Sequence, residues 1–473
     1  MAQSVPDRKI LRENWLRNFA PTDVFNRVRA AQFTSPGMFI VVGIPMFTVF
    51  LWLYYARHDG LPLPVFLTKV SAFSALALLS LNHVLSLRTR FLEKLFRGLD
   101  RMYRVHHVVG QTAFLLIVAH PILLLVARKD SWPMVLDLTV PGRDFGITLG
   151  MVSLYLLLAL LFVTFSLRVR YHKWHLSHHI MVVPLFIAFL HAVASGTYVR
   201  GYPVLRYWLV LLCTLGIASY VYTMFFYRHA GPVHNGRVVG VQDMEDIVEV
   251  RFRLDGHQMS FKAGQFVFIR FLSLDQSYET FPFSLSGAPG EEVLRISAKK
   301  SGDFTRHILP GLNEGDRILV WGPYGAFGEH YHHRNDDSIW IAGGIGATPF
   351  LSMVQDETGS KRDKKRRILF VWVCNSEAEA VYNDEILGAI EGNSRIRYVL
   401  WTSSSMGRIT AEDILRLSSK HIVRRSAPGT GIVKKDLDIF ICGPPPMMAA
   451  LSHQFLDKGF KANSIFFEDF SLL

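Results

Sequence analysis

The chain has 473 residues, half of them hydrophobic, and carries a formal net charge of +12. Its three cysteines, Cys213, Cys374 and Cys442, show no CxxC spacing, which excludes a disulfide framework and a cysteine-built metal cluster. The basic residues do not gather with aromatic residues on a recognisable module, which argues against a nucleic-acid partner.

The N-terminal part of the chain is polar and is followed by a long apolar region. The first 30 residues are charged and lack the apolar core of a signal peptide, so we expect the segment 1–36 to stay in the cytoplasm. Residues 37–228 have a lipid-like composition, and a membrane span requires about 20 mostly apolar residues. Six segments meet this requirement: Gly37–Ala56, Val65–Leu87, Val105–Ala127, Gly146–Leu167, Ser177–Ser195 and about Val204–Tyr227.

The loops between the expected spans differ in charge. Loops 88–104 and 168–176 are strongly basic, whereas 57–64, 128–145 and 196–203 are nearly balanced. Positively charged loops face the cytoplasm and anionic lipid headgroups. The pattern therefore predicts a multi-pass protein, in the plasma membrane, with both basic loops and both termini in the cytoplasm.

Two of the expected spans carry histidine at two depths. His106 and His120 lie 14 residues apart in the third span, and His178 and His191 lie 13 apart in the fifth. An ionisable residue inside a membrane is costly and usually has a partner or a function. The topology places His106 and His178 at the inner level and His120 and His191 at the outer level. Such an arrangement could hold two stacked haems, each with histidine on both sides of the iron.

The spacing supports this arrangement in part. At 1.5 Å per residue, the members of each pair on one helix are separated by about 20 Å. On an ideal helix, two residues 14 apart, such as His106 and His120, point to within about 40° of the same direction. Two residues 13 apart, such as His178 and His191, point about 140° away from each other. A kink at Pro184 would correct the angle between His178 and His191. By spacing alone His107, His175 and His179 are alternative ligands, and His83 is expected to be structural.

The second half of the sequence predicts two soluble domains. Segment 232–330 contains strand-like runs separated by Gly, Asp and Asn, which is typical of a small antiparallel β-barrel. From 338 to 473, strands alternate with helices, which predicts a doubly wound parallel α/β sheet. The polar segment 329–335 is interpreted as a linker. The expected fold is thus an all-α six-helix transmembrane bundle, a β-barrel and an α/β nucleotide-binding domain.

Three glycine-containing turns follow expected strands. One carries Gly343, Gly344 and Gly346 and opens a helix, where small residues let backbone N–H groups approach a pyrophosphate. A second, at Gly322, ends the barrel. The third begins at Cys442, at the carboxyl end of a strand, where open α/β sheets bind ligands.

Together these segments resemble the ferric reductase and NADPH oxidase superfamily, with its ferredoxin-reductase-like flavin and nicotinamide module, over about residues 65–473. Phe281-Pro282-Phe283-Ser284 is similar to the flavin motif HPF[ST]. The resemblance implies that Phe283 packs on the isoalloxazine of FAD and that Ser284 bonds near its N5. Ser301-Gly-Asp-Phe-Thr resembles the segment that meets the flavin pyrophosphate, which makes Gly302 and Thr305 candidates.

The resemblance extends to the nicotinamide half. It implies an NAD(P)H loop, an element near the nicotinamide and a C-terminal aromatic residue that guards the flavin. The corresponding residues are Gly343, Gly344, Gly346 and Thr348 for the loop, Cys442, Gly443 and Pro444 for the element, and Phe470 for the aromatic residue.

The sequence also departs from the family. Phe281 replaces the usual histidine of the flavin motif, so one polar contact to FAD is lost or supplied elsewhere. Asn375 stands where many oxidases carry an arginine for the 2′-phosphate of NADPH, although Arg408 could supply the charge. NADPH and NADH therefore both remain candidates.

The resemblance implies an electron path from cytoplasmic NAD(P)H through FAD and two b-type haems to an acceptor across the membrane, with no protein general base. The acceptor is expected to be O2, giving superoxide, or a ferric chelate. Cationic residues of the outer loops could attract either one: Arg128, Lys129, Arg143 and Arg200. The alternatives are an electron-supply subunit for an extracytoplasmic partner reductase, and a membrane-tethered reductase without haem.

Overall fold

The computed structural model describes residues 35–57, 59–127, 140–142, 144–166, 176–194, 201–227, 233–256, 258–273, 280–302, 304–334, 336–359, 366–419, 421–422 and 437–468. They form two compact units. One unit runs from Ser35 to Val233, and the other contains the described residues from His234 onward.

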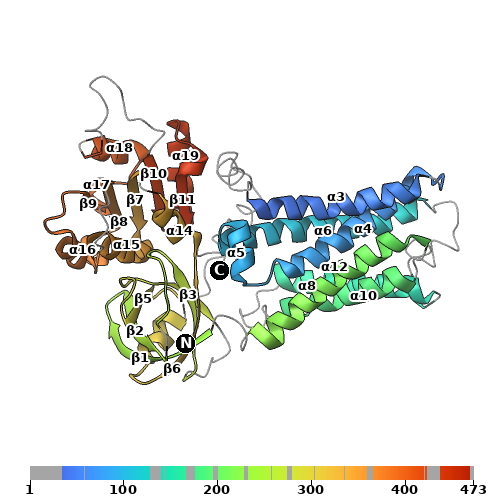
Figure 1. Ribbon diagram of the computed structural model, residues 1–473, viewed down its shortest axis with the longest axis horizontal. Helices are drawn as coiled ribbons and strands as arrows, with labels where there is room; N and C mark the ends of the chain where they lie inside the picture. The colour runs from blue at the N-terminus through green and yellow to red at the C-terminus, as the bar shows by residue number, and fades with distance from the viewer. Residues whose placement is uncertain are drawn as a thin grey trace. The chain divides into compact units, whose positions relative to one another are not determined.

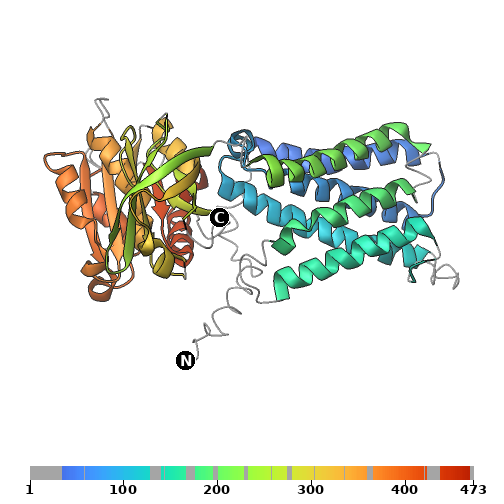
Figure 2. The same ribbon diagram turned by 90° about the horizontal axis from the view of Figure 1, so that it is seen from below.

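The first unit is a bundle of helices that run alongside one another (Figure 1; Figure 2). The bounds are α3 Pro36–Ala56, α4 Leu63–Val84, α5 Arg90–Phe96, α6 Leu99–Ala127, α8 Phe145–Ser166, α10 Val182–Ala194 and α12 Pro203–Val221, which continues as a π-helical turn, Tyr222–Phe226. Among the described residues, six stretches are long and apolar enough to cross a membrane, which confirms the six expected spans.

The sequence predicted a loop over residues 88–104, but the structure shows that much of this segment is helical. It contains α5, whose first turn is capped by the Thr89 hydroxyl, which accepts a bond from the Leu92 N–H at 3.4 Å. Helix α6 then begins at Leu99, six residues before the predicted start. The basic side chains Arg101 and Arg104 therefore lie on a helix, where Arg104 pairs with Asp100 at 2.6 Å.

The fifth apolar stretch, Leu176–Ala194, is interrupted by a turn at Ile180 and Met181. Pro184 has no N–H to donate to the carbonyl four residues earlier, that of Ile180, and its ring crowds that carbonyl. The Ile180 carbonyl accepts a bond from the Val183 N–H instead, at 2.9 Å. The regular helical hydrogen bonding is thus interrupted between His178 and His191.

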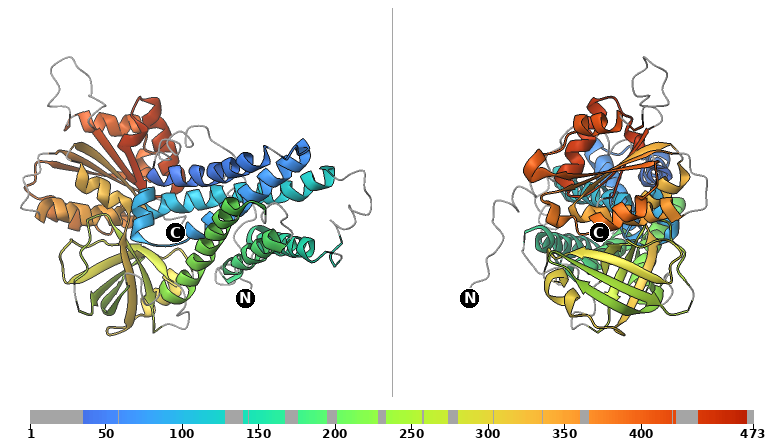
Figure 3. Two further views of the ribbon diagram at one scale, coloured as in Figure 1. Left: turned by 45° about the vertical axis from the view of Figure 1, so that its right-hand side comes forward. Right: turned by 90° about the vertical axis from the view of Figure 1, so that its left-hand side faces the viewer.

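The second unit opens with a six-stranded antiparallel sheet, drawn in yellow-green and yellow in Figure 3. Its strands lie in the order β4-β3-β6-β1-β2-β5. A bridge between Leu285 and Ile296 joins the two edges, so the sheet is a nearly closed barrel. The bounds are β1 Val233–Asp243, β2 Ile247–Leu254, β3 Phe266–Phe271, β4 Phe281–Ser284, β5 Val293–Lys299 and β6 Arg317–Tyr324. Strand β4 contains a proline and lies at an edge, where the missing N–H is tolerated.

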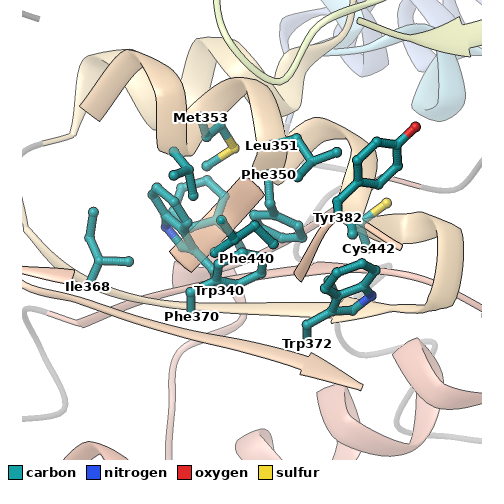
Figure 4. Close-up of a cluster of buried hydrophobic side chains, with 14 of the residues drawn as sticks. Trp340, Phe350, Leu351, Met353, Ile368, Phe370, Trp372, Tyr382, Phe440 and Cys442 are labelled. Atoms are coloured by element: carbon teal, nitrogen blue, oxygen red, sulfur yellow. The ribbon is translucent and has the colours of Figure 1, made fainter. Parts of the chain in front are cut away.

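A five-stranded parallel sheet follows, in the order β11-β10-β7-β8-β9. Its strands are β7 Asp337–Gly343, β8 Ile368–Cys374, β9 Ile396–Thr402, β10 Leu437–Cys442 and β11 Ile465–Glu468, and its larger helices are α14 Ala326–His333, α15 Thr348–Gly359, α16 Asn383–Ile390, α18 Ala411–Ser419 and α19 Pro445–Asp457. Alternate strand residues face opposite sides. Trp340 and Phe370 pack with α15 and α16, as Figure 4 shows in part, and Ile341 and Val371 pack with α18 and α19. The sheet is therefore doubly wound, as the sequence predicted.

The polar segment 329–335 is not the linker that its composition indicated. Most of it belongs to α14, because Phe327 and Tyr331, four residues apart, lie on one helix face and are buried in the sheet's core cluster. The polar side chains between them occupy the remaining faces.

Candidate functional site

Two histidines from different helices lie close together near the N-terminal ends of α6 and of the fifth apolar stretch. The ring centroids of His106 in α6 and His178 in the fifth apolar stretch lie 6.1 Å apart. His106 Nδ1 lies 3.0 Å from the carbonyl oxygen of Asn82 in α4. When Nδ1 donates to a carbonyl, the tautomer is fixed and Nε2 is left as a lone-pair donor.

A second pair repeats this geometry farther along the same helices. His120 in α6 and His191 in α10 have ring centroids 6.5 Å apart. His120 Nδ1 lies 3.1 Å from the Thr68 carbonyl oxygen, and His191 Nδ1 lies 2.7 Å from that of Gly146. In both rings a proton on Nδ1, donated to the carbonyl, fixes the tautomer in which Nε2 carries the lone pair.

These separations fit one metal ion between each pair of rings. Two imidazoles bound to one ion through Nε2, at about 2 Å each, have centroids about 6 Å apart. No group of three or more His, Cys, Asp or Glu side chains among the described residues could hold a metal. A pair with only two protein ligands suits haem, whose macrocycle supplies the other ligands to the iron.

The neighbouring helices supply contacts that the sequence analysis did not identify. Thr68 and Asn82 are 14 residues apart on α4, which matches the spacing of His120 and His106 on the antiparallel α6. On α8, a Cβ at Gly150 would lie 2.9 Å from the His191 ring. The spacing Gly146-x-x-x-Gly150 is a small-residue pattern that permits close helix packing and could have indicated this contact.

The alternative histidines lie elsewhere. His107 is exposed, and its ring centroid lies 6.0 Å from that of the neighbouring His106. His179 lies 6.1 Å from the Tyr220 ring, and His83 Nδ1 lies 2.9 Å from the Leu79 carbonyl of its own helix. His175 falls outside the described residues.

The flavin-like motif forms β4 at the edge of the barrel. Phe281 and Pro282 are half-buried, whereas Phe283 and Ser284 are buried, with Phe283 in the barrel's core cluster. Phe281 stacks on Phe304, with centroids 3.8 Å apart and ring planes at 16°. The residue that replaces the family's histidine thus joins β4 to the second flavin-like segment.

That second segment is a turn before a short π-helix, Phe304–Ile308. The Thr305 hydroxyl accepts bonds from the backbone N–H groups of Ser301 and Gly302, each at 3.2 Å. Gly302 itself is exposed, with open space where a Cβ would lie. The turn is therefore held in shape by Thr305 while its backbone stays accessible.

The glycine loop after β7 packs directly on the turn after β10. A Cβ at Gly346 would lie 2.3 Å from the Cys442 carbonyl oxygen, and one at Gly443 would lie 2.9 Å from the Gly343 Cα. Gly344 differs, because it has a φ of +53° and open space around it. Three of these glycines thus serve loop packing, and Gly344 is the one that faces open space.

The remaining predicted residues lie near the ends of their elements. Gly322 lies within β6 and not in a turn after it, at a φ of +145°. Thr348 is the first residue of α15, and its hydroxyl donates to the Ile345 carbonyl at 3.1 Å. Pro444 precedes α19, and Arg408 is exposed in the loop before α18. The predicted Phe470 falls outside the described residues, as do the outer-loop cations, Arg128, Lys129, Arg143 and Arg200.

Three family models match successive parts of the chain. They are a ferric reductase like transmembrane component over residues 71–190, an FAD-binding domain over 233–328 and an oxidoreductase NAD-binding domain over 340–453. Within the first range lie three of the four histidines of the two pairs, and the fourth, His191, is the first residue beyond its end. The second and third ranges cover the barrel and most of the α/β sheet.

Similar proteins include a flavohemoprotein of Bacillus subtilis (strain 168), 31% identical over 44% of this chain and 51% of that protein. NADPH oxidase 1 of Mus musculus is 26% identical over 50% of this chain and 45% of that protein. A solved FAD/NAD-binding domain of nitric oxide dioxygenase from Vibrio cholerae O1 biovar El Tor is 20% identical, with a TM-score of 0.40 over 50% of this chain and 97% of that one.

The chain spans about half the length of the two curated relatives described here. Its three matched ranges follow the order of bundle, barrel and parallel sheet. The chain is a multi-pass membrane protein with FAD-binding and NAD-binding domains, and it belongs to the superfamily of ferric reductases and NADPH oxidases.

Proposed function

We propose that this chain is a transmembrane oxidoreductase that oxidises NADPH or NADH in the cytoplasm and reduces O2 to superoxide across the membrane. The balanced reaction is NAD(P)H + 2 O2 → NAD(P)+ + H+ + 2 O2•−. When bound, FAD accepts two electrons as a hydride and releases them singly, and b-type haems carry single electrons. Both termini lie in the cytoplasm of this proposed plasma-membrane protein.

The observation that carries the proposal is the presence of two histidine pairs at two levels of one bundle, with centroid separations of 6.1 and 6.5 Å. His106 and His178 would hold the inner haem, and His120 and His191 the outer one. The backbone carbonyls of α4 and α8 contact Nδ1 of three of these rings, so Nε2 would be the atom that each of these rings offers to an iron.

In the second unit, the chain's task is to bind two cofactors and exclude side reactions. We assign six residues to the FAD site: Pro282, Phe283, Ser284, Gly302, Thr305 and Gly322. We assign a second set to the binding of NAD(P)H and to the side of the flavin that the nicotinamide approaches: Gly343, Gly344, Gly346, Thr348, Arg408, Cys442, Gly443, Pro444 and Phe470. Gly344 supports the dinucleotide assignment most directly, since its backbone faces open space at the carboxyl edge of the parallel sheet.

The test uses purified full-length protein supplied with FAD, haem and NADH or NADPH. A reduced-minus-oxidised spectrum should show b-type bands at two haems per FAD. Cytochrome c reduction should be largely suppressed by superoxide dismutase. Dismutase-insensitive reduction with fast ferric-chelate turnover would replace O2 by a ferric chelate as the acceptor. Haem reduction without either acceptor reaction would favour an extracytoplasmic partner protein, and absence of b-type bands would end the haem proposal.

A further inference from the structure

A partly buried polar network crosses from the barrel to the parallel sheet inside the second unit. Its centre is the carboxylate of Glu385, in the first turn of α16. Arg295, on β5 of the barrel, donates from Nη1 to Oε2 at 2.8 Å and from Nη2 to Oε1 at 2.6 Å. Gln355, on α15, donates from Nε2 to the same Oε1 at 2.7 Å. One carboxylate therefore connects three separate elements.

The same guanidinium also bonds to the chain just beyond the flavin-like motif. Arg295 Nη2 donates to the carbonyl oxygen of Ser286 at 2.7 Å, two residues beyond β4. The Ser286 N–H donates to the Arg295 carbonyl at 2.8 Å, and the Ser286 and Ser297 hydroxyls lie 3.1 Å apart. The position of Ser286, two residues after the motif, is thus tied to that of Arg295.

A second arm runs through Tyr382, the residue before α16. Its hydroxyl lies 2.6 Å from Ser297 Oγ and 3.1 Å from Glu249 Oε2, both on barrel strands. Figure 4 shows Tyr382 at the edge of the sheet's core cluster, with its hydroxyl directed away from the other labelled side chains. The side chains of Glu249 and Arg295 are 3% and 12% exposed. The arm is therefore shielded from water on the barrel side.

Net stability does not account for such a network. The side chains of Arg295 and Glu385 are 12% and 32% exposed, so the pair is partly withdrawn from water, and the free energy that this costs offsets much of the attraction between the two charges. A guanidinium and a carboxylate joined by two hydrogen bonds instead fix the distance and the angle between the two secondary-structure elements that carry them. Here the two elements are β5 and α16. The bond to the Ser286 carbonyl links Arg295 to the chain just beyond β4, and Gln355 links Glu385 to α15, the helix that follows the glycine loop Gly343–Gly346.

We propose that Arg295 and Glu385 are positioning residues that set the distance between the nicotinamide and the flavin for hydride transfer. This inference rests on the proposed function. In the step, the C4–H bond of the dihydronicotinamide breaks and its electron pair and hydrogen form an N–H bond at flavin N5. Water supplies one proton to complete the reduced flavin, and NAD(P)+ leaves. Because reacting atoms must lie about 3–3.5 Å apart, a displacement of 1 Å costs about 100-fold in rate.

The experiment measures anaerobic flavin reduction by stopped flow in the full-length holoprotein, with whichever of NADH and NADPH the wild type oxidises and with its C4-deuterated form. The variants are Arg295→Gln, Glu385→Gln, the double variant and Arg295→Lys. The matched control is Arg253→Gln, which removes an exposed ion pair to Glu292 at 3.0 Å within the barrel.

We expect Glu385→Gln and Arg295→Gln to slow flavin reduction on the order of 10- to 100-fold. The dissociation constant for the dinucleotide, the FAD content and the rate of flavin reduction by dithionite should remain unchanged. The deuterium isotope effect should rise as hydride transfer becomes limiting, and Arg295→Lys should recover part of the rate. Arg253→Gln should behave like the wild type.

Two results would overturn the inference. One is a wild-type rate of flavin reduction in the double variant. The other is loss of FAD or thermal stability while the remaining holoprotein is still reduced at the wild-type rate, which would assign the network a structural role only. A wild-type protein whose flavin neither NADH nor NADPH reduces would instead refute the proposed function and this inference with it.

Discussion

His191 lies so close to Gly150 that a Cβ at residue 150 would approach the imidazole to 2.9 Å. The glycine allows the ring to lie against α8, where Nδ1 is 2.7 Å from the Gly146 carbonyl oxygen. Gly150→Ala should therefore displace His191 and reduce haem occupancy towards one per FAD in the purified protein. Gly43→Ala, in α3, is the matched control, because a Cβ there meets nothing within 4 Å. Full haem content in Gly150→Ala would contradict the expected displacement.

The ligands themselves can be tested one level at a time. His191→Leu should remove the outer haem and His106→Leu the inner one, since a haem held by two axial histidines loses one ligand in each case. Pyridine haemochrome assays should give one haem per FAD in place of two, and redox titration should lose one of two components. His107→Leu should keep both. Retention of both haems by His191→Leu would refute that ligand assignment.

The glycines of the dinucleotide loop should respond differently to the same substitution. Gly346→Ala places a Cβ 2.3 Å from a backbone oxygen, so it should reduce folded yield and thermal stability severely. Gly344→Ala meets no neighbour, and its φ of +53° adds a strain of about 1 kcal/mol. We expect Gly344→Ala to fold and to raise KM for the dinucleotide with a smaller change in kcat. Equal folded yields for both variants would contradict this distinction.

Phe281 and Phe304 should act as one unit in FAD binding. Their rings stack with centroids 3.8 Å apart, and an aromatic pair contributes about 0.5–1.5 kcal/mol beyond its buried area. Each single alanine variant should weaken FAD affinity several-fold, and the double variant should be little weaker than either. Titration of the apoprotein with FAD measures the coupling, with the exposed Leu387→Ala as control. Strictly additive losses would show that the two residues act independently.

The sequence predicted those elements whose signals are local. The six apolar stretches and the strand-like runs of the barrel are visible in the composition of the sequence, and the described residues contain both. Strand β4 was not predicted, because four residues with an internal proline carry no alternation signal. Helix α14 was interpreted as a linker because histidines surround its two buried aromatics, Phe327 and Tyr331, which become recognisable only through the core they enter.

The candidate site was predictable to the same extent. The depth of the four histidines follows from span boundaries, whereas the choice of partner depends on helix phase. The helical hydrogen bonding changes at Pro184, where the Ile180 carbonyl accepts a bond from the Val183 N–H because residue 184 has no N–H. The spacing of the histidines suggested such a change, but it did not show which hydrogen bond is altered. The carbonyl acceptors at Thr68 and Gly146 belong to other helices, so only the packed bundle identifies them.

Asp438 provides a test of pH dependence outside the membrane bundle. This carboxyl on β10 is 1% exposed, and burial raises its pKa to about 6, against the opposing effect of Arg334, whose Nη1 lies 2.7 Å away. The folded state therefore binds a proton more tightly than the unfolded chain between about pH 4 and pH 6. Folding stability should fall as the pH rises through this window, by on the order of 2–3 kcal/mol, and stay lower above it.

Asp438→Asn should remove this dependence, because the amide does not ionise. The thermal midpoint of the variant relative to the wild type should increase from pH 4.5 to pH 7. Asp413→Asn is the matched control with the opposite sign, since hydrogen bonds from Thr410 lower the pKa of that carboxyl. Its stability contribution is present above the unfolded pKa and is lost in acid, so this variant should lose most at pH 7. A midpoint difference for Asp438→Asn that does not change with pH would mean that the buried carboxyl is ionised throughout.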